Sequence, residues 1–134
     1  AVAAGQCDIA IVNNYYLGAM FISKNKAEQE AAQQVQIFWP NQDGRGVHVN
    51  ISGGAITASS KNKQSAIALL EFLVSDSAQQ WYAETNLEYP VKPGVQLSEI
   101  LKSWGKFKAD TLSLHRLGEL NGQAVMIMDH AVWK

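Results

Sequence analysis

The chain has 134 residues, of which 47% are hydrophobic and 17% charged, a composition typical of a globular domain that excludes a disordered tail. Eleven basic and twelve acidic residues give a net charge of -1 without a block of like charge, which argues against nucleic acid and polybasic membrane binding. One cysteine excludes an internal disulfide, and no apolar run is long enough for a membrane span. A self-contained fold of this size would bury about two thirds of its surface.

The first part of the chain predicts a strand followed by two helices. Residues 1–5 read as the end of a helix, and the apolar run CDIAIV at residues 7–12 predicts a buried strand of a parallel sheet, with Cys7 as a buried thiol. Asn13 and Asn14 then precede an apolar stretch, which is a signal for the start of a helix over residues 15–22. The polar segment 24–34, rich in Ala, Glu and Gln, predicts an exposed helix.

The middle of the chain predicts two more strands around a loop. Residues 35–39 (VQIFW) read as a strand that Pro40 ends, and the turn formers of residues 41–46 predict a loop. Apolar and polar residues then alternate over residues 47–51, which indicates a strand that ends near Gly53.

Helical periodicity dominates the rest of the chain. It predicts a helix over residues 62–84 with a new start near Ser75, and a short helix capped by Ser98. Residues 114–133 carry a further apolar helical face, with a break expected at Gly122. Strands that alternate with helices indicate an α/β fold that is rich in helix.

The adjacent phenols of Tyr15 and Tyr16 are the strongest candidates for site chemistry. A free phenol has a pKa near 10, but a hard trivalent cation favours its phenolate form, so two such oxygens suit iron(III). The start of the helix adds a partial positive charge that favours phenolates or an anion. A tyrosine pair at this place is nevertheless more often part of a core or of an aromatic interface than a pair of ligands.

No other motif indicates a site. The spacings of His48, His115 and His130 do not form a helical metal pair, and each reads as an ordinary exposed or core imidazole. No G-x-S-x-G motif occurs, and no spacing suggests a base with a nucleophile, so we expect that the protein is not an enzyme.

Several motifs, taken in order, resemble a known family. They are DIAIVNNYYLGAMF, FWPNQDGRGVHVNISGGAIT, AIALLEFLVSDSAQQWYAE, NLEYPVKPGV, SWGKFKADTLSL and VMIMDHAVWK. Together they look like the C-terminal part of the ferric-ion-binding periplasmic proteins, the substrate-binding components of bacterial iron(III) ABC transporters. The ordered combination of N-x-Y-Y with P-N-Q-x-G-R-G-x-H-V-N-I-S is far more specific than either piece alone, and the resemblance covers essentially the whole chain.

This resemblance implies part of a two-lobed, type II periplasmic binding-protein fold. Residues 1–40 would belong to the second lobe with the tyrosine corner, residues 41–89 would supply the hinge strand near Arg45 and helices of the first lobe, and residues 90–134 would return to the second lobe. By similarity, Tyr15 and Tyr16 donate phenolate oxygens to Fe(III), and Asn13 supports the site or a synergistic anion such as carbonate or phosphate. The family's other ligands come from sequence that is absent here.

The resemblance also implies partners and a location. We expect contacts with the missing N-terminal half and with an inner-membrane ABC permease, self-association of the fragment, no nucleic-acid partner, and a periplasmic or lipid-anchored cell-surface location. Two alternatives remain open. One is a binding protein of the same fold for a polyamine, thiamine or an organic anion, and the other is a helical protein-interaction module built on residues 62–84.

Overall fold

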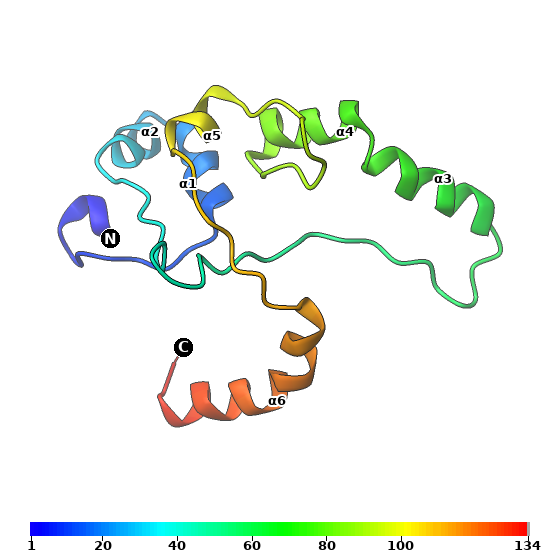
Figure 1. The fold of residues 1–134 in the computed structure, drawn as a ribbon. Helices are drawn as coiled ribbons and strands as arrows, with labels where there is room; N and C mark the ends of the chain where they lie inside the picture. Colours follow the sequence, from blue (N-terminus) through cyan, green and yellow to red (C-terminus); the bar gives the residue numbers. More distant parts are fainter. Residues whose placement is uncertain (134) are drawn as a thin grey trace. The chain divides into compact units, whose positions relative to one another are not determined.

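The computed structural model describes residues 1–133, and its regular elements are helical (Figure 1). In chain order they are the short 3-10 helix η1 (Val2–Ala4), α1 (Asn14–Phe21), α2 (Lys26–Gln33), α3 (Lys63–Leu73), α4 (Asp76–Trp81), the π-helical turn η2 (Tyr82–Asn86), α5 (Glu99–Ser103) and α6 (Leu114–His130). The predicted helices are therefore confirmed, with boundaries that differ by a few residues.

Side-chain caps explain where several of these helices begin. Asn25 accepts a hydrogen bond from the Ala27 amide at 3.0 Å at the start of α2. Ser75 begins α4 and Ser98 begins α5, and each hydroxyl oxygen accepts from a backbone N–H three residues later at 3.3 Å. These bonds satisfy donors that the first turn of a helix leaves without a partner. The restart at Ser75 and the cap at Ser98 were both predictable for that reason.

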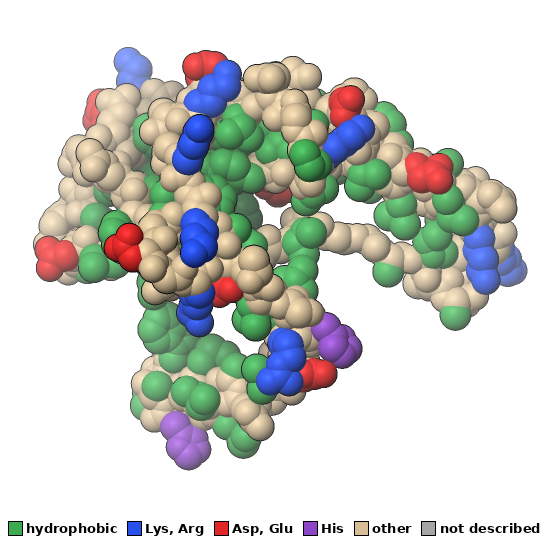
Figure 2. Space-filling model, in the orientation of Figure 1, with side chains coloured by type: hydrophobic (Ala, Val, Ile, Leu, Met, Phe, Trp, Pro, Cys, Tyr) green, Lys and Arg blue, Asp and Glu red, His purple; other side chains and the backbone are tan. Residues whose placement is uncertain are grey.

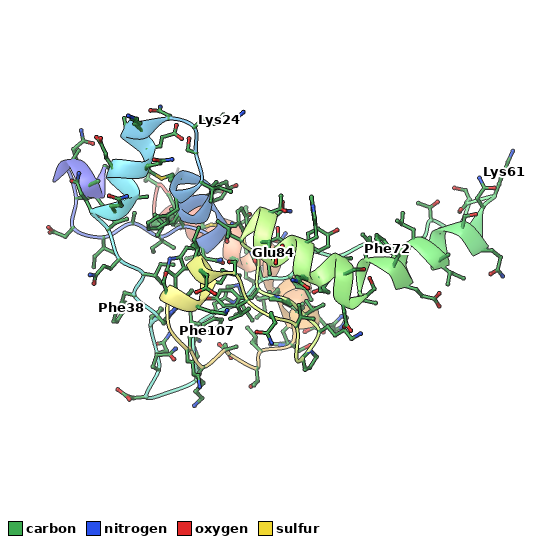
Figure 3. The ribbon with its side chains drawn as sticks, turned by 90° about the horizontal axis from the view of Figure 1, so that it is seen from above. Lys24, Phe38, Lys61, Phe72, Glu84 and Phe107 are labelled. Carbon is green, nitrogen blue, oxygen red and sulfur yellow. The ribbon has the colours of Figure 1, made fainter. Side chains whose placement is uncertain are left out.

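The three predicted strands are wrong for this chain by itself. Residues 7–12, 35–39 and 47–51 run without a hydrogen-bonded ladder, and residues 1–133 contain only one isolated parallel bridge, between Val47 and Ala109. A strand needs a neighbour to pair with over several residues, and in the described part of the chain these segments pair only at that one bridge. Ile9 is 82% exposed, and Phe38, labelled in Figure 3, is 84% exposed. Cys7, predicted to be buried, is exposed for the same reason.

The predicted break at Gly122 is also wrong, because α6 runs through this residue without interruption. A single glycine costs a helix only about 1 kcal/mol relative to alanine, and helical periodicity continues on both sides of it.

Contacts divide the chain into two compact units. The first unit comprises Ala1–Phe38 and Gly53–Lys106, and the second comprises Trp39–Ser52 and the chain from Phe107 onward. The assignment of residues 1–40, 41–89 and 90–134 to lobes stays a prediction.

The core of the first unit lies between η2 and α5. Ala83, Leu87 and Leu101 are fully buried there, and partly buried side chains pack around them: Tyr89, Leu97, Ile100 and Trp104. Within the same unit α1 contacts both α2 and η2. Helix α1 thus packs beside the element that carries Ala83 of this cluster.

The second unit is held by contacts between its loop 39–47 and residues 107–110. The amide of Gln42 donates to the Lys108 carbonyl at 3.1 Å, and the Lys108 N–H donates to the Gln42 side chain at 2.7 Å. Arg45 pairs with Asp110 at 3.4 Å. Gly46 has a φ of +99°, and a Cβ on it would lie 2.6 Å from the backbone of Ala109, so only glycine fits.

Much apolar surface remains exposed. The described chain exposes 10582 Å², whereas a self-contained protein of this mass exposes roughly 7,000 Å². Figure 2 shows hydrophobic side chains on the surfaces of α3 and of α6, and they include Ile67, Leu69, Phe72, Leu114, Leu117, Leu120, Met126 and Ile127. No helix among residues 1–133 is long and apolar enough to cross a bilayer.

Candidate metal centre

The tyrosine pair lies at the first turn of α1. Asn13 is the residue before the helix, and its extended backbone, with φ -70° and ψ 138°, turns the chain from the irregular segment 7–12 into α1. Its side chain does not cap the helix and instead donates a hydrogen bond to the Tyr15 hydroxyl at 3.0 Å. The structure therefore brings together the three residues that the sequence singled out, Asn13, Tyr15 and Tyr16.

The two phenol rings lie against each other and remain accessible. Their centroids are 4.6 Å apart and their planes are tilted by 49°. Tyr15 is half-buried, and Tyr16 is 58% exposed. The pair is thus not enclosed in an aliphatic core, the arrangement that would have favoured a purely structural role.

Without a metal, the local environment keeps the proton on Tyr15. A side-chain hydrogen bond with Tyr16 raises the pKa of the Tyr15 phenol above its ordinary value, and loss of solvent, the negative charge of an ionised Tyr16 and the Glu88 carboxylate raise it further. The hydrogen bond from Asn13 acts in the opposite direction. A cation that binds the pair must therefore supply enough attraction to displace this proton.

Tyr89 differs from the pair in its surroundings. Burial raises the pKa of its phenol to about 12, and its hydroxyl donates to the Leu101 carbonyl at 3.4 Å. It packs against the core cluster of the first unit. These contacts give Tyr89 a packing role in that core.

The described part of the chain offers no cluster of the commoner metal-ligating side chains that would compete with the phenol pair. Residues 1–133 contain no group of three or more His, Cys, Asp and Glu side chains that could hold an ion. His115 is exposed and lies 3.3 Å from Glu119 on α6, which is an ordinary surface contact. The phenol pair is therefore the best-defined candidate.

Sequence reasoning missed the contact that supports the pair. The Asn14 amide donates to the Leu87 carbonyl at 3.1 Å, and a Cβ on Gly18 would lie 2.6 Å from Leu87 Cδ1. The one available signal was a glycine within the apolar helical stretch, since such a residue often marks a close approach.

Comparison with known proteins identifies the family. Residues 2–109 match the model of the bacterial extracellular solute-binding proteins. The chain belongs to this family. It is 43% identical over its full length to iron uptake protein A1 of Synechocystis, and 32% identical over 119 residues to the major ferric iron-binding protein of Neisseria meningitidis serogroup B.

Solved structures confirm the fold class. A Trichodesmium protein (IdiA, FutA) in complex with iron and citrate matches 99% of this chain with a TM-score of 0.94 and 46% identity. The ferric-binding protein of Campylobacter jejuni matches 96% with a TM-score of 0.91 and 40% identity. The chain therefore has part of a type II periplasmic binding-protein fold, and the resemblance to ferric-ion-binding proteins is confirmed.

The match covers only part of each relative. The chain spans 37% of the Synechocystis protein, 35% of the Neisseria protein and 42% of the Trichodesmium structure. The strand segments without partners and the exposed apolar helices agree with a fold that needs more sequence than is present here.

Proposed function

We propose that this chain is the part of a ferric-ion-binding protein that supplies two of the metal's ligands, the phenolate oxygens of Tyr15 and Tyr16. The observation that carries the proposal is the pair itself, two touching rings at the start of α1, one of them largely exposed. The names of the relatives support iron(III) as the ion.

The chemistry of the pair suits iron(III) better than softer metals. Phenolate is a hard oxygen donor, and a highly charged ion lowers the pKa of a bound phenol because only the ionised form gains the full electrostatic attraction. Zinc and copper(I) prefer thiolate and imidazole donors, which this corner lacks. The partial positive charge at the start of α1 favours the anionic oxygens further.

Two phenolates leave most of an octahedral shell to other donors. We propose that an oxygen anion fills part of it, with Asn13 in support. Carbonate and phosphate suit this role, and citrate accompanies iron in the Trichodesmium structure. Further protein ligands would come from sequence beyond residues 1–134, in a cleft between two lobes, with residues 1–40 and 90–134 in the same lobe as the tyrosines.

The biological role that follows is capture and delivery, without catalysis. The protein would bind iron(III) in the periplasm or at the cell surface and pass it to an inner-membrane ABC permease. One relative is named a periplasmic iron(III)-binding protein and others are named for iron uptake, which supports this role. Lobe opening, reduction of the iron or protonation of the phenolates would release the ion.

Iron titration of the full-length protein tests this function. Ferric citrate is added while the visible spectrum is recorded, and a phenolate-to-iron charge-transfer band is expected at one iron per protein. The double variant Tyr15→Phe, Tyr16→Phe should lose this band, whereas Tyr82→Phe, a control tyrosine from η2, should keep it.

A band that persists unchanged in the double variant would eliminate the assigned ligands. If the wild type gives no colour but a polyamine, thiamine or an organic anion protects it against heat without metal, the solute is not iron.

A further inference from the structure

The side chain of Asn14 joins the start of α1 to a distant part of the chain. Its Nδ2 donates to the Leu87 carbonyl oxygen at 3.1 Å, across 73 positions of sequence. Leu87 is fixed where it lies, because its side chain is 1% exposed in the core cluster with Ala83 and Leu101. The carbonyl that Asn14 binds is therefore held by packing.

The backbone at Leu87 is also unusual. It follows the π-helical turn η2 and has a φ of +57°, the left-handed region that a branched side chain rarely adopts. π-helical turns occur frequently at functional sites. The turn therefore ends at Leu87, the residue whose carbonyl oxygen accepts the hydrogen bond from the Asn14 side chain.

Gly18 provides a second contact on the same side of α1. It follows Asn14 by four residues, so both lie on one face of the helix. A Cβ at Gly18 would lie 2.6 Å from Leu87 Cδ1 and 2.8 Å from Leu87 Cβ, distances that real side chains do not reach. The Leu87 side chain thus lies directly against the helix backbone.

We infer that Asn14, Gly18 and Leu87 form a clamp that fixes the position and rotation of α1, and that they are thereby positioning residues for the two phenols. Asn14 directly precedes Tyr15, so a rotation of α1 about its axis moves both phenol oxygens. Two ligands must reach one ion together, and groups that orient metal ligands typically change affinity by about 10- to 100-fold when they are lost. This inference rests on the proposed function.

Two alanine variants of the full-length protein test the clamp. Asn14→Ala removes the hydrogen bond, and Gly18→Ala places a methyl group against Leu87. Alanine is a better helix former than asparagine or glycine, so neither change weakens α1 by itself. Gly44→Ala is the control, because a Cβ at this exposed loop glycine would make only an ordinary contact, 3.8 Å from the Asn41 carbonyl oxygen.

We expect both clamp variants to bind iron(III), supplied as ferric citrate, about 10- to 100-fold more weakly than the wild type and with a shifted charge-transfer band. The control should match the wild type. A second readout needs no metal: nuclear Overhauser contacts between the α1 backbone at position 18 and the Leu87 methyl groups, which lie directly against each other in the structure, should weaken in both clamp variants as α1 shifts.

Unchanged affinity, together with unchanged contacts between α1 and Leu87, in both clamp variants would overturn the inference. A colourless wild type would instead overturn the proposed function, and the metal-free contacts between α1 and Leu87 would then decide the clamp by themselves.

Discussion

The start of α1 and the whole of α6 differ in how far the rest of the described chain packs against them. Asn14 and Gly18 hold α1 against a buried leucine from a distant part of the chain. By contrast, α6 is twice as long and has no buried residue, and Ser113 at its start makes no capping bond. The chain thus supports the residues proposed to bind iron by its own contacts, but leaves a long apolar helix without cover.

The same difference separates the helices from the extended segments. Helices satisfy their backbone hydrogen bonds internally, so they form here wherever the local pattern predicts them. Residues 7–12 and 35–39 need partners from another segment and remain without a ladder. Since the relatives are more than twice as long, we expect the missing partners in sequence beyond this chain.

The largest effect that we predict is the pH dependence of iron binding. Both phenols of the pair must lose a proton to bind as phenolates, and the pKa of Tyr15 is raised in the metal-free protein. The apparent affinity should therefore fall as pH falls, by about tenfold per pH unit for each phenol and about 100-fold for both. Competition with a chelator between pH 6 and 8, corrected for the chelator's own protonation, measures this slope in the full-length protein.

The double variant Tyr15→Phe, Tyr16→Phe is the control for the pH slope. The residual iron affinity of this variant should change much less with pH than that of the wild type. A wild-type affinity that does not change with pH would argue against phenolate ligands.

A second prediction compares buried and exposed leucines. Leu101 is fully buried in the core of the first unit, whereas Leu117 on α6 is 37% exposed. In residues 1–134, Leu101→Ala should lower the free energy of unfolding by about 2–5 kcal/mol, and Leu117→Ala by less than about 1 kcal/mol. Urea denaturation measures both, and equal losses would contradict the comparison.

The same two substitutions in the full-length protein test whether α6 is covered there. In the full-length protein the loss for Leu117→Ala should approach that for Leu101→Ala, because we expect additional sequence to cover the helix. A loss that stays below about 1 kcal/mol there would show that α6 keeps its exposed surface.

The smallest predicted effect concerns two serines at helix starts. Ser98 caps α5 with a hydrogen bond to the Leu101 amide, whereas Ser113 makes no such bond at α6. Ser98→Ala should cost about 1 kcal/mol of unfolding free energy, and Ser113→Ala should stay within about 0.5 kcal/mol of the wild type. Thermal or urea unfolding distinguishes them, and a larger loss at Ser113 would reverse the expected order.

Local patterns predicted the helices but not the pairing of the strands. The caps at Ser75 and Ser98 follow from hydroxyls placed before apolar repeats, which is information within a few residues. The run at residues 7–12 has the composition of a buried strand, but composition does not show whether a partner is present. Cys7 was placed in a core for the same reason and is exposed.

The residues of the candidate site could be predicted from the sequence, but the long-range contact that holds them in place could not. Asn13, Tyr15 and Tyr16 are neighbours in sequence, so a turn before a helix was enough to bring them together. The contact between Asn14 and Leu87 joins residues 73 positions apart. Such a pairing depends on the packed core around Leu87, which no local pattern describes.

Resonance Raman spectroscopy of the iron-loaded, full-length protein tests the assigned ligands most directly. With excitation in the charge-transfer band, we expect phenolate vibrations in the wild type, about half their intensity per iron in each single variant, Tyr15→Phe or Tyr16→Phe, and none in the double variant. Phenolate vibrations of undiminished intensity in the double variant would contradict the assignment of iron to this pair.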